Sequence, residues 1–301
     1  MSMISATVNG QTVEIAEGGS ILDACRVAGI DLPTLCHGPT MTPANACRVC
    51  VVELEGSRTL VPSCSRALED GMEIRTAGER AEHSRRLVME LLDSATELDR
   101  SGSELRDWME EAGVQRHRFG PAADPKSRTK PSPGHHKPEV SGVAASVAEP
   151  VKIEDDLYVR DYSRCILCYQ CVDACGVEHQ NTFAITVAGR GFDAHIATEF
   201  DVALPDSACV YCGNCVAVCP TGALMGKVEY DMREGGNWDE ASQDVTRTVC
   251  SYCGVGCNLD LHTQEGQIVK VTSPHDHDVT LGNLCIKGRF GWSFVHSGFG
   301  D

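Results

Sequence analysis

Residues 165–175 read CILCYQCVDAC, and residues 209–220 read CVYCGNCVAVCP. Both stretches space four cysteines as C-x2-C-x2-C-x3-C, and Pro220 follows the last cysteine of the second run. Thiolates at this spacing are typical ligands of iron–sulfur clusters. The two runs therefore predict a region that folds around two clusters, and a zinc or purely structural role is the weaker interpretation.

The paired runs resemble the two-cluster ferredoxin of the bacterial type. In that family the fourth cysteine of each run binds the other run's cluster, so the resemblance implies two crossed [4Fe–4S] sites. One site would take Cys165, Cys168, Cys171 and Cys219. The other would take Cys209, Cys212, Cys215 and Cys175. Gly176 stands where proline is common, which leaves the ligands unchanged.

The N-terminal stretch predicts a hairpin followed by a helix. ISATVNGQTVEIAEG reads as two short strands joined at Asn9-Gly10, a pair of residues that favours tight hairpin turns. GGSILDACRVAGI then reads as a helix that begins after Ser20, with Asp23 completing a capping box.

A second kind of cysteine group follows this helix. Its spacing is C-x10-C-x2-C-x13-C, formed by Cys36, Cys47, Cys50 and Cys64. Hairpin, helix and cysteine loop together resemble the β-grasp [2Fe–2S] ferredoxin of complex I, iron-only hydrogenase and soluble formate dehydrogenase subunits, which implies one [2Fe–2S] cluster on these thiols. A zinc ribbon is the alternative, although zinc sites usually pair two short C-x2-4-C knuckles.

A last group begins in VCSYCGVGCNLDL, residues 249–261, and predicts a third [4Fe–4S] cluster. Its members are Cys250, Cys253, Cys257 and Cys285. The stretch between Cys257 and Cys285 alternates around Glu265-Gly266 and predicts a hairpin. This pattern resembles the cluster domain of molybdopterin oxidoreductases, particularly formate dehydrogenases. In that family a lysine at the position of Lys287 helps electrons pass between cluster and pterin.

Composition limits the remaining interpretations. The four groups use 16 of the 17 cysteines and leave Cys25, which we expect to be a small buried residue of the predicted helix. The first residues have no signal-peptide pattern, and no apolar run approaches the roughly 20 residues of a membrane span, so we expect a cytoplasmic location. In that reducing compartment a disulfide framework is the weaker interpretation of so many cysteines. A net charge of −17 argues against nucleic acid as a partner.

The predicted fold class is α+β, in several small modules joined end to end. Residues 1–78 form the β-grasp [2Fe–2S] domain, and residues 79–118 form a helical connector that lacks the His/Cys3 cluster of the resembled family. Residues 119–150, rich in Pro, Ala, Ser and Gly, form a linker. Residues 151–240 form the two-cluster ferredoxin domain, and residues 241–301 form a small β-rich [4Fe–4S] domain.

The resemblance implies an electron-transfer subunit, or a split N-terminal half, of a formate dehydrogenase-like enzyme. The chain stops soon after Cys285, so we expect the molybdenum or tungsten bis-pterin, and the catalytic residues, in a partner or a missing domain. The implied partners are a catalytic molybdopterin subunit and an NAD(P)-linked flavin diaphorase.

Three alternatives remain open. The chain could be a relay subunit of a hydrogenase or of a complex-I-like NADH dehydrogenase, a zinc-stapled scaffold without redox activity, or the product of a truncated reading frame.

Overall fold

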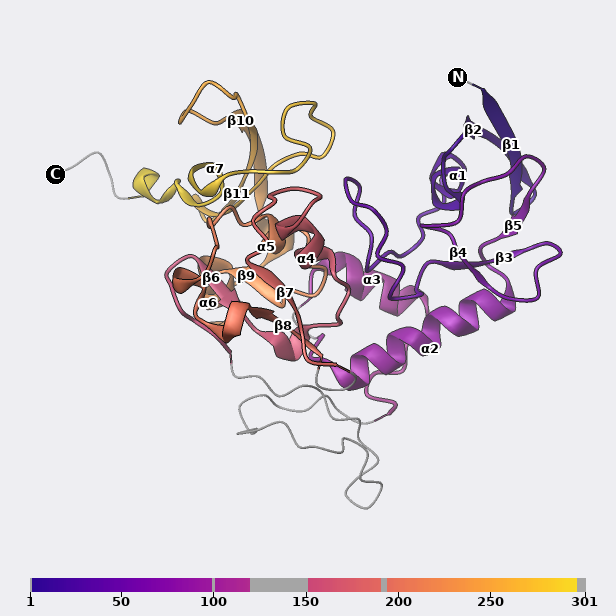
Figure 1. Cartoon of the computed structure of the whole chain (residues 1–301), viewed down its shortest axis with the longest axis horizontal. Coiled ribbons are helices and arrows are strands. Elements are labelled where there is room, and N and C mark those ends of the chain that lie inside the picture. Colours follow the sequence, from indigo (N-terminus) through magenta and orange to yellow (C-terminus); the bar gives the residue numbers. More distant parts are fainter. Residues whose placement is uncertain (1, 99–100, 120–150, 191–193, 297–301) are drawn as a thin grey trace, which may run out of the picture.

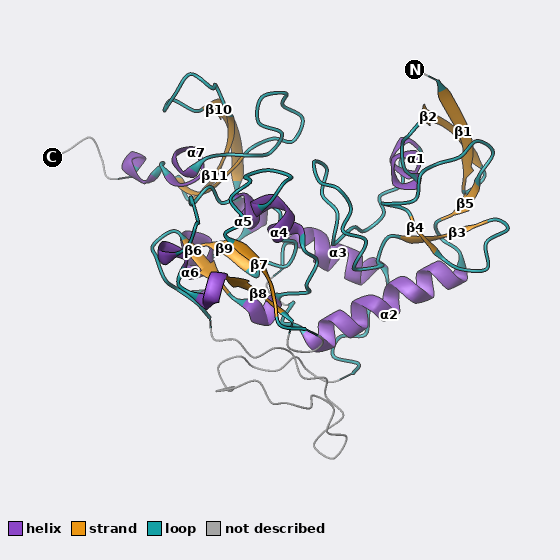
Figure 2. Cartoon of the chain, in the orientation of Figure 1, coloured by secondary structure: helices purple, strands orange, loops and turns teal. Residues whose placement is uncertain are grey.

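The computed structural model describes residues 2–98, 101–119, 151–190 and 194–296. Helices and strands are mixed along the described chain, which is an α and β protein in several modules (Figure 1, Figure 2). Apart from Phe119, the predicted linker lies outside the described residues. No helix in the described ranges is both long and apolar enough to cross a membrane.

The N-terminal module is a five-stranded sheet in the order β2-β1-β5-β3-β4. Its strands are β1 (Met3–Val8), β2 (Gln11–Ala16), β3 (Val51–Leu54), β4 (Val61–Pro62) and β5 (Glu73–Arg75). β1 pairs antiparallel with β2 and parallel with β5, and β5 pairs antiparallel with β3. The hairpin predicted at Asn9-Gly10 is confirmed, since both residues have the positive φ that a tight hairpin turn needs.

Helix α1 (Ile21–Val27) packs on this sheet and closes its core. The predicted capping box is confirmed: the Asp23 N–H donates to Ser20 Oγ, and the Ser20 N–H donates to the Asp23 carboxylate. Cys25 is fully buried in this core, as predicted, and burial raises the pKa of its thiol to about 11.

Two helices connect the N-terminal module to the rest of the chain: α2 (Glu79–Ala95) and α3 (Ser103–Glu111). Met89 of α2 and Leu105 of α3 share a buried cluster with Leu35 and Val49, so the helices support the loop that carries the first cysteines. Figure 1 shows α2 running beneath the N-terminal module toward the second lobe.

The second lobe contains the two cysteine runs. Its strands form two antiparallel pairs, β6 (Tyr158–Arg160) with β9 (Leu224–Gly226) and β7 (Ile185–Ala188) with β8 (His195–Thr198). Its helices are α4 (Gln170–Cys175), α5 (Asn214–Ala217) and α6 (Lys227–Glu234). Helices α4 and α5 are short, start within the two cysteine runs and contact each other.

The C-terminal module is a three-stranded antiparallel sheet followed by a short helix. Its elements are β10 (Asp244–Val249), β11 (Asn258–Gln264), β12 (Gln267–Thr272) and α7 (Ile286–Phe290). The hairpin predicted at Glu265-Gly266 is confirmed as the β11–β12 turn, whereas β10 was not predicted. The remaining elements are 3-10 turns, at Tyr162–Arg164, Glu199–Asp201, Leu204–Asp206, Glu240–Ser242 and Ser293–Val295.

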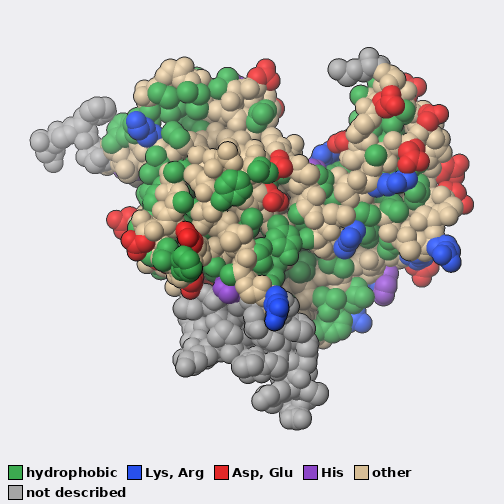
Figure 3. All heavy atoms as spheres, in the orientation of Figure 1, with side chains coloured by type: hydrophobic (Ala, Val, Ile, Leu, Met, Phe, Trp, Pro, Cys, Tyr) green, Lys and Arg blue, Asp and Glu red, His purple; other side chains and the backbone are tan. Residues whose placement is uncertain are grey.

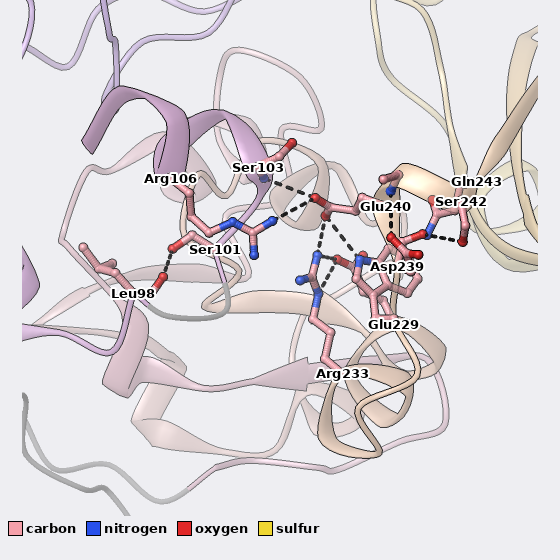
Figure 4. A network of polar contacts seen from close by, with 12 residues as sticks. Leu98, Ser101, Ser103, Arg106, Glu229, Arg233, Asp239, Glu240, Ser242 and Gln243 are labelled. Atoms are coloured by element: carbon pink, nitrogen blue, oxygen red, sulfur yellow. Dashed lines mark hydrogen bonds and ion pairs between the residues drawn. The ribbon is translucent and has the colours of Figure 1, made fainter. Parts of the chain in front are cut away.

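Polar contacts around Glu240 join the connector to the second lobe (Figure 4). The Glu240 carboxylate accepts from the Ser103 N–H at the start of α3 and lies 2.6 Å from the guanidinium of Arg233 on α6. Arg233 also pairs with Glu229, 2.8 Å away. Figure 3 shows a notch between the N-terminal module and the rest of the molecule. A pocket between these parts is lined by His37 and Thr40 of the N-terminal module and by His275 of the C-terminal module.

Candidate metal centres

The first cysteine group lies on the loops next to β3 and β4. The sulfur atoms of Cys50 and Cys64 are 3.4 Å apart, and the Cys47 N–H donates to Cys36 Sγ over 3.4 Å. Hydrogen bonds from the side chains of Cys47 and Cys64 hold the pKa of Cys36 well below its usual range, against the effect of burial. A hydrogen bond from Cys64 also lowers the pKa of Cys50, to about 6. The structure therefore brings all four predicted thiols together, with Cys36 and Cys50 favoured as the thiolates that metals bind.

The two runs of the second lobe exchange their last cysteines. Burial raises the pKa of Cys165, Cys168 and Cys171, and the negative charge of Cys219 raises each of them further. Cys219 belongs to the second run in sequence, yet it lies with the first run in space.

The same exchange holds for the other run. Burial and then neighbouring thiolates raise the pKa of Cys209, Cys212 and Cys215, and Cys175 is among those neighbours for all three. Cys175, the last cysteine of the first run, thus lies with the second. The crossed placement that the resemblance implies is the arrangement of thiols in this structure.

The backbone conformation of the two runs repeats. Leu167 and Tyr211 both have positive φ, 52° and 55°, and their N–H groups donate to Cys165 Sγ and Cys209 Sγ, each over 3.4 Å. Such N–H groups partly neutralise thiolate charge and are a means of setting a cluster's reduction potential.

The crossing cysteines receive similar bonds. The Ala184 N–H donates to Cys175 Sγ over 3.2 Å, and the Leu224 N–H donates to Cys219 Sγ over 3.5 Å. Both donors lie at or just before a strand, β7 or β9, so the small sheets help to hold the fourth thiol of each set.

The last group lies between β10 and α7. Burial raises the pKa of Cys257, and the charges of Cys250, Cys253 and Cys285 raise it further, which places the four predicted thiols near one another. Cys253 and Cys285 are exposed, and so is Lys287, on α7 two residues beyond Cys285.

Each of the four groups offers thiols alone, the donor set of an iron–sulfur cluster, so the residues fit the implied cofactors in kind and proximity. Within the described ranges, no group of three or more His, Cys, Asp or Glu side chains is arranged to hold a single metal ion.

Contacts that the sequence did not reveal join neighbouring groups. Gln170, between Cys168 and Cys171, donates from Nε2 to the Leu35 carbonyl over 2.9 Å. Asn214, between Cys212 and Cys215, accepts at Oδ1 from the Leu284 N–H over 3.1 Å. Each run has an amide side chain directly before its third cysteine, but the local sequence does not indicate the distant partner of that amide.

Arg289 of α7 is a third such contact. Its guanidinium is buried, donates to the Cys212 carbonyl over 3.0 Å, and makes no ion pair with a carboxylate among the described residues. Phe290 packs at 5.2 Å from the ring of Tyr158, in the core of the second lobe. The C-terminal module is therefore docked against the second cysteine run.

Three domain families match the chain. The 2Fe-2S iron–sulfur cluster binding domain matches residues 1–79, the 4Fe-4S dicluster domain matches residues 164–223, and the molybdopterin oxidoreductase Fe4S4 domain matches residues 243–297. The chain therefore contains segments similar to two ferredoxin-type iron–sulfur domains and to the iron–sulfur domain of molybdopterin oxidoreductases.

Curated relatives extend over nearly the whole chain. An NADH-quinone oxidoreductase subunit of Rhizobium meliloti is 33% identical, and the alpha subunit of an NADPH-Fe(3+) oxidoreductase of Geobacter sulfurreducens is 36% identical. Each match covers 98% of this chain and 32% of the relative, so the chain spans about a third of their length. The NADP-reducing hydrogenase subunit HndD of Solidesulfovibrio fructosivorans is 37% identical over 75% of the chain and 36% of its own length.

A solved structure shares the fold. A chain of an NAD+-reducing [NiFe]-hydrogenase, crystallised in the H2-reduced state, superimposes with a TM-score of 0.54 at 23% identity. The match covers 74% of this chain and 87% of the hydrogenase chain. At that identity, the likeness concerns the fold alone.

Proposed function

We propose that the chain holds four iron–sulfur clusters in sequence and relays single electrons between a pterin active site and an NAD(P)-linked partner. The proposal includes a β-grasp [2Fe–2S] domain, a two-cluster ferredoxin domain of the bacterial type and a β-rich [4Fe–4S] domain. The cofactors would be one [2Fe–2S] and three [4Fe–4S] clusters, on the crossed thiol sets described above. When bound, such clusters supply one-electron oxidation and reduction.

The observation that carries the proposal is the spatial order of the thiol groups. The charge of Cys36 adds to the factors that raise the pKa of Cys168, so the first group is a near neighbour of the set completed by Cys219. Helices α4 and α5 contact each other between the two crossed sets. Arg289 and Asn214 then join the set of Cys212 to the module of Cys285.

The chain's own residues bury the thiols, direct N–H groups at the sulfur atoms and fix the spacing of the modules. Cys285, one of the two exposed thiols of the last group, lies two residues from Lys287, which we assign to the contact with a pterin-bearing region. The first group would face a flavin diaphorase.

Relatives whose names specify NADH or NADPH support a nicotinamide link, and putative formate dehydrogenases of Staphylococcus at 24% identity support a formate-type active site. A cytoplasmic location belongs to the same proposal.

A relay in a hydrogenase or in a complex-I-like enzyme is the second candidate. It is favoured by the similarity to the hydrogenase subunit HndD. The match of residues 243–297 to the molybdopterin oxidoreductase domain favours the pterin-linked interpretation over a hydrogenase. Purification with native partners would separate the two, because molybdenum or tungsten accompanies only the first.

Metal and sulfide analysis of the anaerobically prepared chain tests the relay itself. The proposal predicts about 14 iron atoms per chain, with matching acid-labile sulfide. Stoichiometric zinc with little iron would instead establish the zinc-stapled scaffold.

A further inference from the structure

Each of the two cysteine runs contains an amide side chain to which the proposed function assigns no role. Gln170 and Asn214 occupy the same position in their runs, directly before the third cysteine, and each is the first residue of its helix, α4 or α5. Both are buried, with 5% and 3% of their surface exposed. In each case the preceding residue, Tyr169 or Gly213, has a left-handed φ near +70°.

Gln170 reaches out of its module toward the first cysteine group. Its Nε2 donates to the carbonyl oxygen of Leu35, which is itself fully buried and directly precedes Cys36. Gly38 lies against the same amide: a Cβ added there would be 3.1 Å from Gln170 Oε1. One hydrogen bond thus connects the loop of Cys168 and Cys171 to Leu35, the residue that directly precedes Cys36.

Asn214 reaches the opposite way, toward the last cysteine group. Its Oδ1 accepts from the N–H of Leu284, which directly precedes Cys285, and from Arg289 Nη2 over 3.3 Å. Arg289 also donates to the carbonyl of Cys212. The loop of Cys212 and Cys215 is therefore connected to Leu284, the residue that directly precedes Cys285.

We infer that Gln170 and Asn214 are a matched pair of positioning residues that couple the two-run module to its neighbours on either side for electron transfer. The inference rests on the proposed function. Each transfer moves one electron, so that one cluster is oxidised by one unit and its neighbour reduced by one, without making or breaking a bond. The amides fix the separation of neighbouring thiol groups and provide a hydrogen-bonded path between them.

The two amides use opposite halves of the side chain, and this difference gives a sharp test. Gln170 acts as a donor, so Gln170→Glu places a carboxylate against the Leu35 carbonyl and turns attraction into repulsion. Asn214 acts as an acceptor, so Asn214→Asp keeps the bond from Leu284 and gains Arg289 as an ion-pair partner. Asn214→Leu removes the acceptor while keeping the size of the side chain.

The experiment mixes the cluster-loaded full chain with one equivalent of dithionite, a low-potential reductant. Freeze-quench EPR then follows how the added electrons redistribute between the [2Fe–2S] and [4Fe–4S] signals. Gln170→Glu and Asn214→Leu should slow redistribution across their respective contacts, roughly tenfold for a displaced donor–acceptor geometry. Asn214→Asp should stay close to the wild-type rate.

A second readout concerns position alone and needs no electron transfer. Exchange of the Leu284 N–H with deuterium should accelerate in Asn214→Leu and remain slow in Asn214→Asp. Gln11→Glu and Gln267→Glu are controls, since both are exposed amides of the outer modules, and neither should change redistribution.

The outcomes separate the inference from the function beneath it. If wild-type chain shows no redistribution among its clusters, the proposed relay is wrong. If the wild type redistributes electrons and both amide-to-acid variants behave alike, at unchanged iron content and midpoint potentials, the relay stands and the inference is overturned. Gln170→Met is a further test, because it also lacks the donor at Nε2. The inference predicts that its rate of electron redistribution is as slow as that of Gln170→Glu, and a wild-type rate in Gln170→Met contradicts the inference.

Discussion

Gly213 shows how closely the thiol groups depend on single residues. Its φ is +72°, and a Cβ at this position would lie 2.1 Å from Cδ of Arg289. An L-residue there is therefore disfavoured twice, by its own backbone and by the guanidinium that docks the C-terminal module. In the first run, Tyr169 occupies the equivalent position with φ +67°, so the backbone alone does not demand glycine.

We expect Gly213→Ala to displace Arg289 and destabilise the folded chain by roughly 1–3 kcal/mol, the range for a strained left-handed residue. Urea unfolding followed by tryptophan fluorescence measures this loss. Gly102→Ala is the matched control, because Gly102 has negative φ and open space around its Cα, and a loss there as large as at Gly213 would contradict the account.

Cys25 provides a test of which cysteines bind a cluster and which does not. It is fully buried in the α1 core, and its thiol pKa of about 11 keeps it protonated at neutral pH. Cys25→Ala should therefore retain the whole iron content, whereas Cys50→Ala should lose the [2Fe–2S] signal. Iodoacetamide should leave Cys25 unmodified in the folded chain; loss of iron from Cys25→Ala would show that it is a ligand.

Residue chemistry made the cysteines predictable and the amides unpredictable. Thiols at fixed spacing have few other uses in a chain with so many, so their grouping could be inferred from sequence. Gln170 and Asn214 are ordinary polar residues until folding brings Leu35 and Leu284 to them, across sequence separations of 135 and 70 residues. Their roles depend on tertiary contacts that no local pattern encodes.

At the scale of elements, the connector helices are held by buried acids. Asp93 and Glu90 of α2 are buried, and they accept from Arg116 and Arg118 over 2.6 Å each. Burial opposes ionisation of Glu90, but bonds from Arg118 and the Gln115 N–H lower its pKa overall. In this chain, α2 and α3 are thus stabilised by ion pairs and by the apolar cluster around Met89.

Glu240 fixes α3 to α6, and its removal should loosen the connector (Figure 4). Burial raises the pKa of Glu240, but bonds from Trp238 and Arg233 lower it more. Its contribution is therefore complete above the unfolded pKa of about 4.3, and it is lost as pH falls through the folded value.

Glu240→Gln should reduce the unfolding free energy at pH 7 by about 1–3 kcal/mol, the range for hydrogen bonds to charged groups. It should also weaken the dependence of stability on pH below about 4.3. Urea titrations at pH 7 and at a pH below about 4.3 measure these effects. Glu69→Gln, which breaks an exposed pair with Arg66, is the control, and an equal loss there would contradict the role given to Glu240.

Elements with strong local signals were predicted well. The Asn9-Gly10 and Glu265-Gly266 hairpins and the capped helix α1 follow from turn and cap chemistry that acts within a few residues. Strand β10 was missed because all its residues are exposed, so it has no apolar alternation. The connector was predicted as one helical stretch, but Thr96 has an extended backbone and ends α2.

At the scale of the whole molecule, the modules place the thiol groups in an order. The N-terminal module, the second lobe and the C-terminal module meet through the buried side chains of Gln170 and Asn214. Sequence resemblance predicted the iron–sulfur domains and their type, which the domain families confirm. The domain boundaries and the ligand sets remain predictions.

The central claim is that the group of Cys36 is a direct neighbour of the set formed by Cys165, Cys168, Cys171 and Cys219. Pulsed EPR on the reduced, cluster-loaded chain tests it, since a nearby [4Fe–4S] spin accelerates relaxation of the [2Fe–2S] signal. We predict accelerated relaxation in the wild type and in Cys175→Ser, and slow relaxation in Cys219→Ser. Slow relaxation in the wild type, or its loss in Cys175→Ser but not in Cys219→Ser, would contradict the claim.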